Sequence, residues 1–199
     1  MSEKRDFKFD KKAEKYDDSY EGKLSEKFYT LVTENVRLTD GMAVLEMGCG
    51  TGTILHRLSQ RCSISGHGID VEEKMLEQAR KKCPDMEILN CSCDNTPFED
   101  GKFDVIVACM AYHHFPEQKR FREEALRVLK PGGSLYICDP RFPAPVRWTL
   151  NTFFRDAGFR TAGENTKAFE GTGFSTVKIV KDQYVQVLHF EKRTEDDRQ

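Results

Sequence analysis

The sequence lacks any long hydrophobic run. The longest, Val105–Tyr112, has eight residues, whereas a transmembrane helix needs roughly 18 or more. We therefore expect no membrane span. The first residues, Met1–Asp6, carry charges with no apolar stretch behind them, so we also expect no secretory signal peptide. Both expectations favour a cytoplasmic protein.

Excess charge and paired metal-binding cysteines are missing as well. The 31 basic side chains nearly balance the 33 acidic ones, for a formal charge of −2. A balanced chain has no long-range attraction to nucleic acid, so we expect no nucleic-acid partner. None of the seven cysteines forms a Cys-x-x-Cys pair, and Cys91 with Cys93 lacks the second pair of a zinc site. We expect reduced thiols and no metal.

Short apolar runs and amphipathic segments alternate along most of the chain. This pattern predicts strands at residues 42–47, 64–69, 86–91, 103–110 and 134–138, with helices at 53–60, 72–82 and 117–130. Strands that alternate with helices of this length indicate an α/β fold. We predict a Rossmann-like, doubly wound and mostly parallel sheet with helices on both faces.

The two ends of the chain depart from this alternation. Apolar residues recur with helical spacing over 23–36. Beyond residue 140 we expect helices at 149–157 and 165–170, then strand-like segments at 175–180 and 184–191. Two strands around the turn Lys181–Gln183 predict an antiparallel β-hairpin at the edge of the sheet. No repeat or low-complexity linker divides the chain, which predicts a single domain.

Three glycines at alternate positions follow the first predicted strand. Gly48, Gly50 and Gly52 let the backbone turn sharply and approach a ligand without a Cβ in the way. Asp70 ends the second strand 22 positions after Gly48, near the spacing of about 20 that places a carboxylate on ribose hydroxyls. Together these features predict a cofactor that contains adenosine.

The glycine spacing and a nearby acid help to identify that cofactor. The dinucleotide pattern Gly-x-Gly-x-x-Gly requires glycine at Thr53, but here the glycine comes one residue earlier, at Gly52. Glu46 lies two residues before the loop and would repel a pyrophosphate, whereas it suits a cationic ligand. The pattern favours a positively charged amino-acid nucleoside over a dinucleotide.

These residues resemble the class I S-adenosylmethionine-dependent methyltransferases, in the small branch that includes quinone-biosynthesis methyltransferases. The matching motifs are Leu45–Gly52, Gly68–Asp70, Met75-Leu76, Pro97–Asp104, His113-His114 and Arg127–Gly133, with Phe9-Asp10 and Tyr16-Asp17 upstream. The resemblance covers about residues 7–139. It implies one domain over 1–199, with an N-terminal helical cap at 1–36, a cofactor-binding core at 42–139, and acceptor-side helices and hairpin at 140–193.

The resemblance also implies S-adenosylmethionine as cofactor and S-adenosylhomocysteine as product. Glu46 and Gly48 would hold the methionine moiety, Asp70 the ribose hydroxyls, and Val71 would pack on adenine. Ser92 stands where the family often has an aspartate for the adenine amino group, with Asp94 as the neighbouring acceptor. The remaining candidate cofactor contacts are Tyr16, Cys49, Gly50, Gly52, Cys93 and Cys109.

The family reaction needs a base only when the nucleophile starts protonated. The candidates are His113 and His114; because they are adjacent, at most one should act, and a structural histidine is the alternative. Asp139 ends the fifth strand at the same edge, as a helix cap or as a catalytic group. We expect Lys81 and Lys82 to form a solvated face.

The sequence thus predicts a methyltransferase acting on a small-molecule acceptor, as a monomer or weak homodimer. Two alternatives remain: an NAD(P)-dependent oxidoreductase, and a non-catalytic S-adenosylmethionine-binding module.

Overall fold

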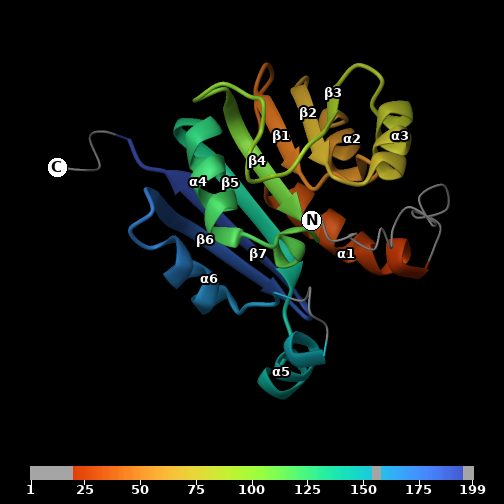
Figure 1. Cartoon of the computed structure of the whole chain (residues 1–199). Coiled ribbons are helices and arrows are strands. Elements are labelled where there is room, and N and C mark those ends of the chain that lie inside the picture. Colours follow the sequence, from red (N-terminus) through yellow and green to blue (C-terminus); the bar gives the residue numbers. More distant parts are fainter. Residues whose placement is uncertain (1–19, 154–157, 195–199) are drawn as a thin grey trace, which may run out of the picture.

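A seven-stranded mixed sheet organises the chain (Figure 1). The structure is a computed structural model that describes residues 20–153 and 158–194. In spatial order the strands run β3-β2-β1-β4-β5-β7-β6. Their bounds are β1 Ala43–Met47, β2 Ser65–Asp70, β3 Glu87–Asn90, β4 Phe103–Cys109, β5 Leu129–Pro140, β6 Phe174–Asp182 and β7 Val185–Lys192.

The first five strands are parallel, and the order of the sheet reverses beside β1. The chain moves from β1 outward through β2 to β3, then crosses back to place β4 on the other side of β1. Glu46 of β1 thereby lies between Gly68 of β2 and Val107 of β4. Ligands of open α/β sheets bind at the carboxyl ends of strands at such a reversal. The fold therefore places the glycine loop after β1 at the expected binding position.

Helices cover both faces of the sheet, as predicted. Their bounds are α1 Tyr20–Asn35, α2 Thr53–Ser59, α3 Glu73–Lys82, α4 Gln118–Val128, α5 Ala144–Phe153 and α6 Ala162–Phe169, with a short 3₁₀ helix, η2, at Tyr112–His114. Buried side chains of α1, α2 and α3 pack on one face of the sheet. Those of α4 and α6 pack on the other face.

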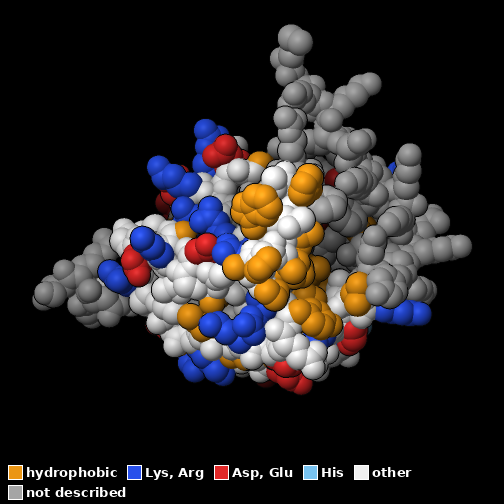
Figure 2. Space-filling model, turned by 90° about the horizontal axis from the view of Figure 1, so that it is seen from below, with side chains coloured by type: hydrophobic (Ala, Val, Ile, Leu, Met, Phe, Trp, Pro, Cys, Tyr) orange, Lys and Arg blue, Asp and Glu red, His pale blue; other side chains and the backbone are white. Residues whose placement is uncertain are grey.

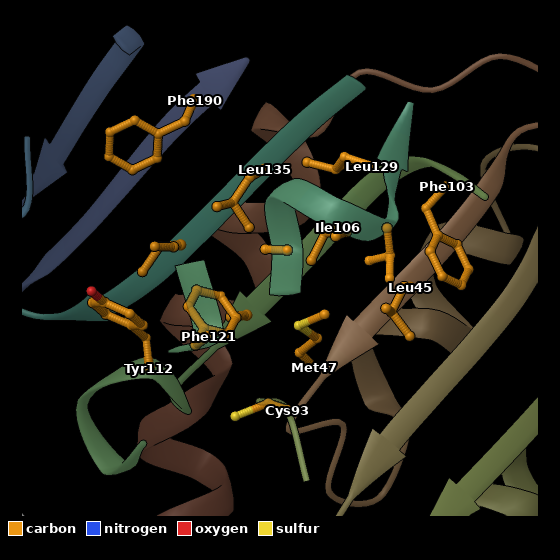
Figure 3. Packing of buried hydrophobic residues seen from close by; sticks show 14 of the residues in the cluster. Leu45, Met47, Cys93, Phe103, Ile106, Tyr112, Phe121, Leu129, Leu135 and Phe190 are labelled. Atoms are coloured by element: carbon orange, nitrogen blue, oxygen red, sulfur yellow. The ribbon is translucent and has the colours of Figure 1, made fainter. Parts of the chain in front are cut away.

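Alternation along the strands supplies both cores. Leu45 of β1 and Ile106 of β4 point to the α4 side, in the same buried cluster as Phe121 of α4 (Figure 3). Their neighbours Val44 and Val105 belong to the cluster on the α1 side. Successive residues of a strand face opposite sides of its sheet, so apolar runs rather than alternating ones mark the strands buried on both faces.

The C-terminal hairpin is antiparallel, which confirms the prediction. β7 pairs antiparallel with β5 on one side and with β6 on the other. β6 is the edge strand, and its pairing is interrupted by a bulge between Thr176 and Lys178. The chain passes from β5 through α5 and α6 to β6, and the hairpin then ends the sheet.

The starts of two elements, β5 and α5, each come five residues before the predicted ones. β5 begins at Leu129, five residues before the strand predicted at 134–138, because Leu129 already pairs with Phe103 before the register shifts. α5 begins at Ala144, five residues before its predicted start. Pro145 lies in its first turn, where proline is compatible with a helix, and the Pro143 carbonyl accepts from the Arg147 N–H. Apolar periodicity alone did not reveal this proline-rich start.

Within residues 20–153 and 158–194, no helix is both long and apolar enough to cross a membrane.

A packing test follows from Gly68 in β2. A Cβ at Gly68 would lie 2.9 Å from Ile88 Cδ1 and 3.0 Å from both Cys49 Sγ and Leu55 Cδ1. We expect Gly68→Ala to destabilise the fold by about 1–3 kcal/mol, which thermal unfolding would register as a fall in Tm of roughly 2–4 °C per kcal/mol.

The matched control is Gly163→Ala in α6, where a Cβ would meet nothing within 4 Å. This substitution should stabilise the protein by about 0.4–1 kcal/mol, because alanine restricts the unfolded chain more than glycine does. Equal Tm values for the two variants would contradict the close packing of β2 against α2.

Candidate functional site

The glycine loop between β1 and α2 has left-handed backbone at all three glycines. Gly48, Gly50 and Gly52 have φ of +77°, +50° and +73°, a region that other residues adopt only at a cost. A Cβ at Gly48 would lie 2.6 Å from the Ala111 Cβ, so the loop packs directly on the segment after β4. A Cβ at Gly50 would meet nothing within 4 Å. The loop is therefore tightly packed at its start and open at Gly50.

Asp70 joins this loop to the beginning of α3. Its Oδ2 accepts from the Gly50 N–H at 2.8 Å, and its Oδ1 accepts from Val71 N–H at 2.7 Å and Glu72 N–H at 3.0 Å. Burial raises the pKa of this carboxyl above its ordinary value, although the three N–H donors oppose the shift. The structure thus brings Asp70, Gly50 and the exposed Val71 together at one edge, as predicted.

Glu46 lies beneath the loop and not on its surface. Its side chain is buried, and Oε2 accepts from the Leu55 N–H at 3.3 Å, in the first turn of α2. Burial raises the pKa of Glu46 well above its usual range; the Leu55 hydrogen bond lowers it, and the charge of Asp70 raises it further. A buried carboxyl of this kind becomes easier to ionise when a cation binds beside it.

Lys82 is a neighbour of the loop that the sequence did not reveal. Its Nζ donates to Thr53 Oγ1 at 2.7 Å and to Thr51 Oγ1 at 3.3 Å. We expected Lys81 and Lys82 to form a solvated face, but only Lys81 is exposed. The interpretation was wrong for Lys82 because the end of α3 packs beside the glycine loop, a contact between segments that local charge patterns do not carry.

The loop after β3 lies beside Asp70. The Cys91 N–H donates to the Asp70 carbonyl at 3.1 Å, which anchors the following residues at this edge. Ser92 and Asp94 are partly buried, and Cys93 is buried. Burial raises the pKa of the Cys93 thiol to about 12, so it stays protonated at neutral pH.

Two other candidate cysteines belong to the core. The side chains of Cys49 and Cys109 lie in the apolar cluster on the α1 side. Burial raises the pKa of both thiols well above the ordinary value. Neither is a reactive thiolate, since reactivity requires a lowered pKa and exposure.

His113 and Asp139 form a buried pair at the ends of β4 and β5. His113 Nδ1 lies 2.8 Å from Asp139 Oδ1, and both side chains are almost fully buried. Phe159 stacks on the His113 ring with centroids 4.6 Å apart, and Phe142 meets Phe159 edge-on. His114 is exposed. The two rings lie 4.0 Å apart, centroid to centroid, so the structure buries His113 against Asp139 and leaves His114 exposed beside it.

The sequence placed Asp139 at this edge but did not pair it with His113. The only sequence signal for the pair was that both follow parallel strands that turned out to be neighbours. Phe159 was missed entirely, because it comes from the region beyond residue 140 that matched no motif.

Two predictions concern absent or undescribed features. Tyr16, a predicted cofactor contact, lies outside the described residues. Among residues 20–153 and 158–194, no cluster of three or more His, Cys, Asp or Glu side chains has the arrangement of a metal site.

Comparisons with known proteins agree with this geometry. The family described as "Methyltransferase domain" matches residues 44–133, from β1 into β5. A demethylmenaquinone methyltransferase of Chlorobaculum tepidum is 34% identical over 63% of this chain and 52% of its own length. A ubiquinone/menaquinone biosynthesis C-methyltransferase of Idiomarina loihiensis is 32% identical over 64% of this chain and 53% of its own. The chain thus spans about half the length of these curated relatives.

A solved structure extends the likeness to almost the whole chain. An S-adenosylmethionine-dependent methyltransferase of Aquifex aeolicus superposes with a TM-score of 0.74 at 25% identity, covering 92% of this chain and 98% of that one. The family match, the relatives and this structure coincide with the glycine loop and the acid at the end of β2. Residues 44–133 therefore match the methyltransferase-domain family, and these findings together support a class I S-adenosylmethionine-dependent methyltransferase.

Proposed function

We propose that this chain transfers the methyl group of S-adenosylmethionine to a small-molecule acceptor, with His113 as the base. One observation carries the proposal: the glycine loop tied to Asp70 and the His113–Asp139 pair lie at the same edge of the sheet. They follow β1, β2, β4 and β5, which are consecutive neighbours in the parallel part of the sheet. A cofactor bound at the first two strand ends would meet an acceptor at the last two.

The residues present fit S-adenosylmethionine. The open backbone at Gly50 leaves room for a ligand against the loop. The Asp70 oxygens retain lone pairs beyond their three backbone donors, which suits ribose hydroxyls. The exposed Val71 offers an apolar surface for adenine, and Ser92 or Asp94 an acceptor for its amino group. Gly48, Gly52, Cys49, Cys93 and Cys109 would contribute backbone and core packing.

Glu46 would balance the cationic charge of the ligand. In the absence of a cation its burial favours the neutral acid, and a positive charge nearby favours the carboxylate. Binding and ionisation of Glu46 are therefore linked: cofactor binding would release a proton from this residue whenever the free protein holds one.

When bound, the cofactor supplies an activated methyl group on a sulfonium that departs as a neutral thioether. The residues of the chain then have to align the acceptor, exclude water and remove a proton where the nucleophile carries one. Asp139 accepts from His113 Nδ1–H and thereby keeps Nε2 as the basic nitrogen. Phe159, stacked on the ring, fixes its plane.

We place the acceptor among small organic molecules with an ionisable O–H or C–H. The buried His113–Asp139 pair would supply a base for such a proton. The aromatic rings of Phe159 and Phe142 beside the pair favour an apolar acceptor. A relative that is a demethylmenaquinone methyltransferase supports the same class of acceptor. Monomeric or weakly dimeric state and the lack of a nucleic-acid partner remain predictions.

Ligand-dependent stability tests the cofactor. We expect S-adenosylmethionine and S-adenosylhomocysteine to raise Tm in separate thermal-shift wells, because a ligand at about 100 times its Kd adds roughly 2.7 kcal/mol to the folded state. NAD and NADP should leave Tm unchanged. A shift with a dinucleotide alone would replace the proposal by the oxidoreductase alternative. Binding without turnover of any acceptor would favour the non-catalytic module.

The carboxylate of Asp70 predicts a direct effect on affinity for the cofactor. Asp70→Ala should raise the Kd for S-adenosylmethionine by about 10- to 100-fold, since hydrogen bonds to a charged group contribute roughly 1.5–3 kcal/mol. Isothermal titration of the folded variant measures this, with Glu73→Ala, an exposed acid in the first turn of α3, as the control. Unchanged affinity in Asp70→Ala would remove the ribose assignment.

Glu46→Gln should abolish a pH dependence. Because the pKa of Glu46 is raised in the free protein and a bound cation lowers it, wild-type affinity should increase as pH rises through the free-state pKa and level off above it. The glutamine variant should bind more weakly and show a flatter profile. Identical profiles for the two proteins would exclude a charge role for Glu46.

The His113–Asp139 pair predicts that substitutions lower the turnover rate and leave cofactor affinity unchanged. His113→Asn should lower kcat by about 10²- to 10⁴-fold, and Asp139→Asn should lower it and shift the pH–rate profile, both with unchanged cofactor Kd. Formation of S-adenosylhomocysteine with a short-chain demethylmenaquinol analogue, or another phenol or quinol that turns over, provides the assay. The control is His114→Asn; if it lost as much activity as His113→Asn, the assignment of the base would be wrong.

A further inference from the structure

Helix α5 has no buried side chain. Val146, Trp148 and Phe153 are 46%, 69% and 74% exposed, although all three are large and apolar. Figure 1 shows α5 set apart from the sheet, at the lower edge of the view. These side chains contribute almost nothing to the core of this molecule, and their contact with water is unfavourable.

Polar contacts attach α5 to neighbouring segments. The Arg147 guanidinium lies 2.6 Å from a Glu164 carboxylate oxygen in α6. The Asn151 side chain donates to the Phe159 carbonyl and accepts from the Phe159 N–H. Arg147 and Asn151, four residues apart, share one side of the helix, whereas Val146 and Phe153, seven apart, lie together on another. Trp148, two residues from Val146, lies on the opposite flank of α5. The polar side thus faces the protein, with Val146 and Phe153 exposed on one flank and Trp148 exposed on the other.

Basic side chains outnumber acidic ones among the described residues around α5. The described residues 141–153 and 158–163 include Arg141, Arg147 and Arg160 and no acidic side chain. Arg141 and Arg160 are exposed, and only Arg147 is paired with an acid. Figure 2, seen from below, shows hydrophobic side chains gathered on this side of the molecule, with both basic and acidic side chains around them. The exposed apolar side chains of α5 therefore lie near two exposed arginines.

We propose that the α5 surface, defined as Val146, Trp148 and Phe153 with Arg141 and Arg160, docks on an anionic phospholipid bilayer. A helix that presents bulky apolar side chains and arginines binds at the level of the lipid headgroups, with its apolar side in the acyl boundary. Each arginine near an anionic leaflet adds attraction that salt weakens. A protein partner would explain the apolar side chains, but complementarity to the arginines favours a polyanionic surface.

The position of α5 connects the bilayer to the proposed reaction. Phe159 contacts Asn151 of α5 through its backbone and stacks on His113 with its ring. Docking of the α5 surface would therefore bring the His113 side of the site close to the membrane, where an apolar acceptor dissolves. In this respect the inference rests on the proposed function.

The single tryptophan of the chain reports on the α5 surface directly. Trp148 is the only tryptophan in the sequence. With vesicles of equal parts phosphatidylcholine and phosphatidylglycerol, we expect a blue shift of its emission and quenching by acyl-brominated lipid. Vesicles of phosphatidylcholine alone, or added 0.5 M NaCl, should weaken binding at least several-fold. Unchanged emission at millimolar anionic lipid would overturn the proposal.

Variants locate the contact in a vesicle sedimentation assay. Phe153→Ser combined with Val146→Ser should lower binding to the anionic vesicles at least tenfold. The matched control, Val177→Ser with Ile179→Ser, removes two exposed apolar side chains of β6 at 40% and 39% exposure and should bind as the wild type does. Equal losses in both double variants would overturn the proposal, since any exposed apolar side chain would then serve.

Two further readouts separate the explanations. A blue shift of Trp148 that depends on protein concentration without vesicles, together with a dimer by sedimentation equilibrium, would assign the α5 surface to a second copy and overturn the proposal. The thermal shift with S-adenosylmethionine is measured on the same samples. If the protein shows the thermal shift but does not bind vesicles, the α5 proposal alone is rejected. If it binds vesicles but shows no thermal shift, the cofactor proposal alone is rejected.

Discussion

The hydrogen bonds of one carboxylate hold the candidate site together. Asp70 ends β2 and accepts from backbone N–H groups of the glycine loop and of the residues that lead into α3. These two segments follow neighbouring parallel strands. Positive φ at three glycines sets the conformation of the loop. Its Gly50 N–H needs an acceptor at this position, because a partly buried N–H without a hydrogen-bond partner costs free energy.

Ionisable groups are buried at the carboxyl edge of the sheet beyond what folding requires. Glu46, Asp139 and His113 all lie there with little solvent exposure. By contrast, Arg127 joins Glu124 and Asp100 in a partly exposed network that fastens the loop before β4. The second arrangement stabilises the fold. Burial of Glu46, Asp139 and His113 instead lowers the stability of the fold, because their charged forms lose hydration. Buried ionisable groups of this kind cluster where a ligand or a reaction uses them. Stability and function thus make opposite demands on the same strand ends.

The sequence predicted most of the fold, because strands buried on both faces appear as apolar runs and the helices between them are amphipathic. It also predicted the glycine loop and Asp70, whose signals are local. It did not predict the start of α5, where Pro143 and Pro145 replace apolar periodicity. The contact of Lys82 with the glycine loop and the stacking of Phe159 on His113 depend on tertiary packing between distant segments. Local sequence carries no record of such contacts.

The edge strand β6 has a consequence for crowded solutions. An unpaired strand edge is a template for pairing with other chains, and Val177 and Ile179 would add apolar surface to such a pair. The bulge between Thr176 and Lys178 interrupts the regular row of hydrogen-bonding groups, and Lys178 and Lys181 place positive charges along it. Two copies that approach edge to edge would bring like charges together on an irregular backbone. The sheet can therefore end in an open strand without inviting growth into aggregates.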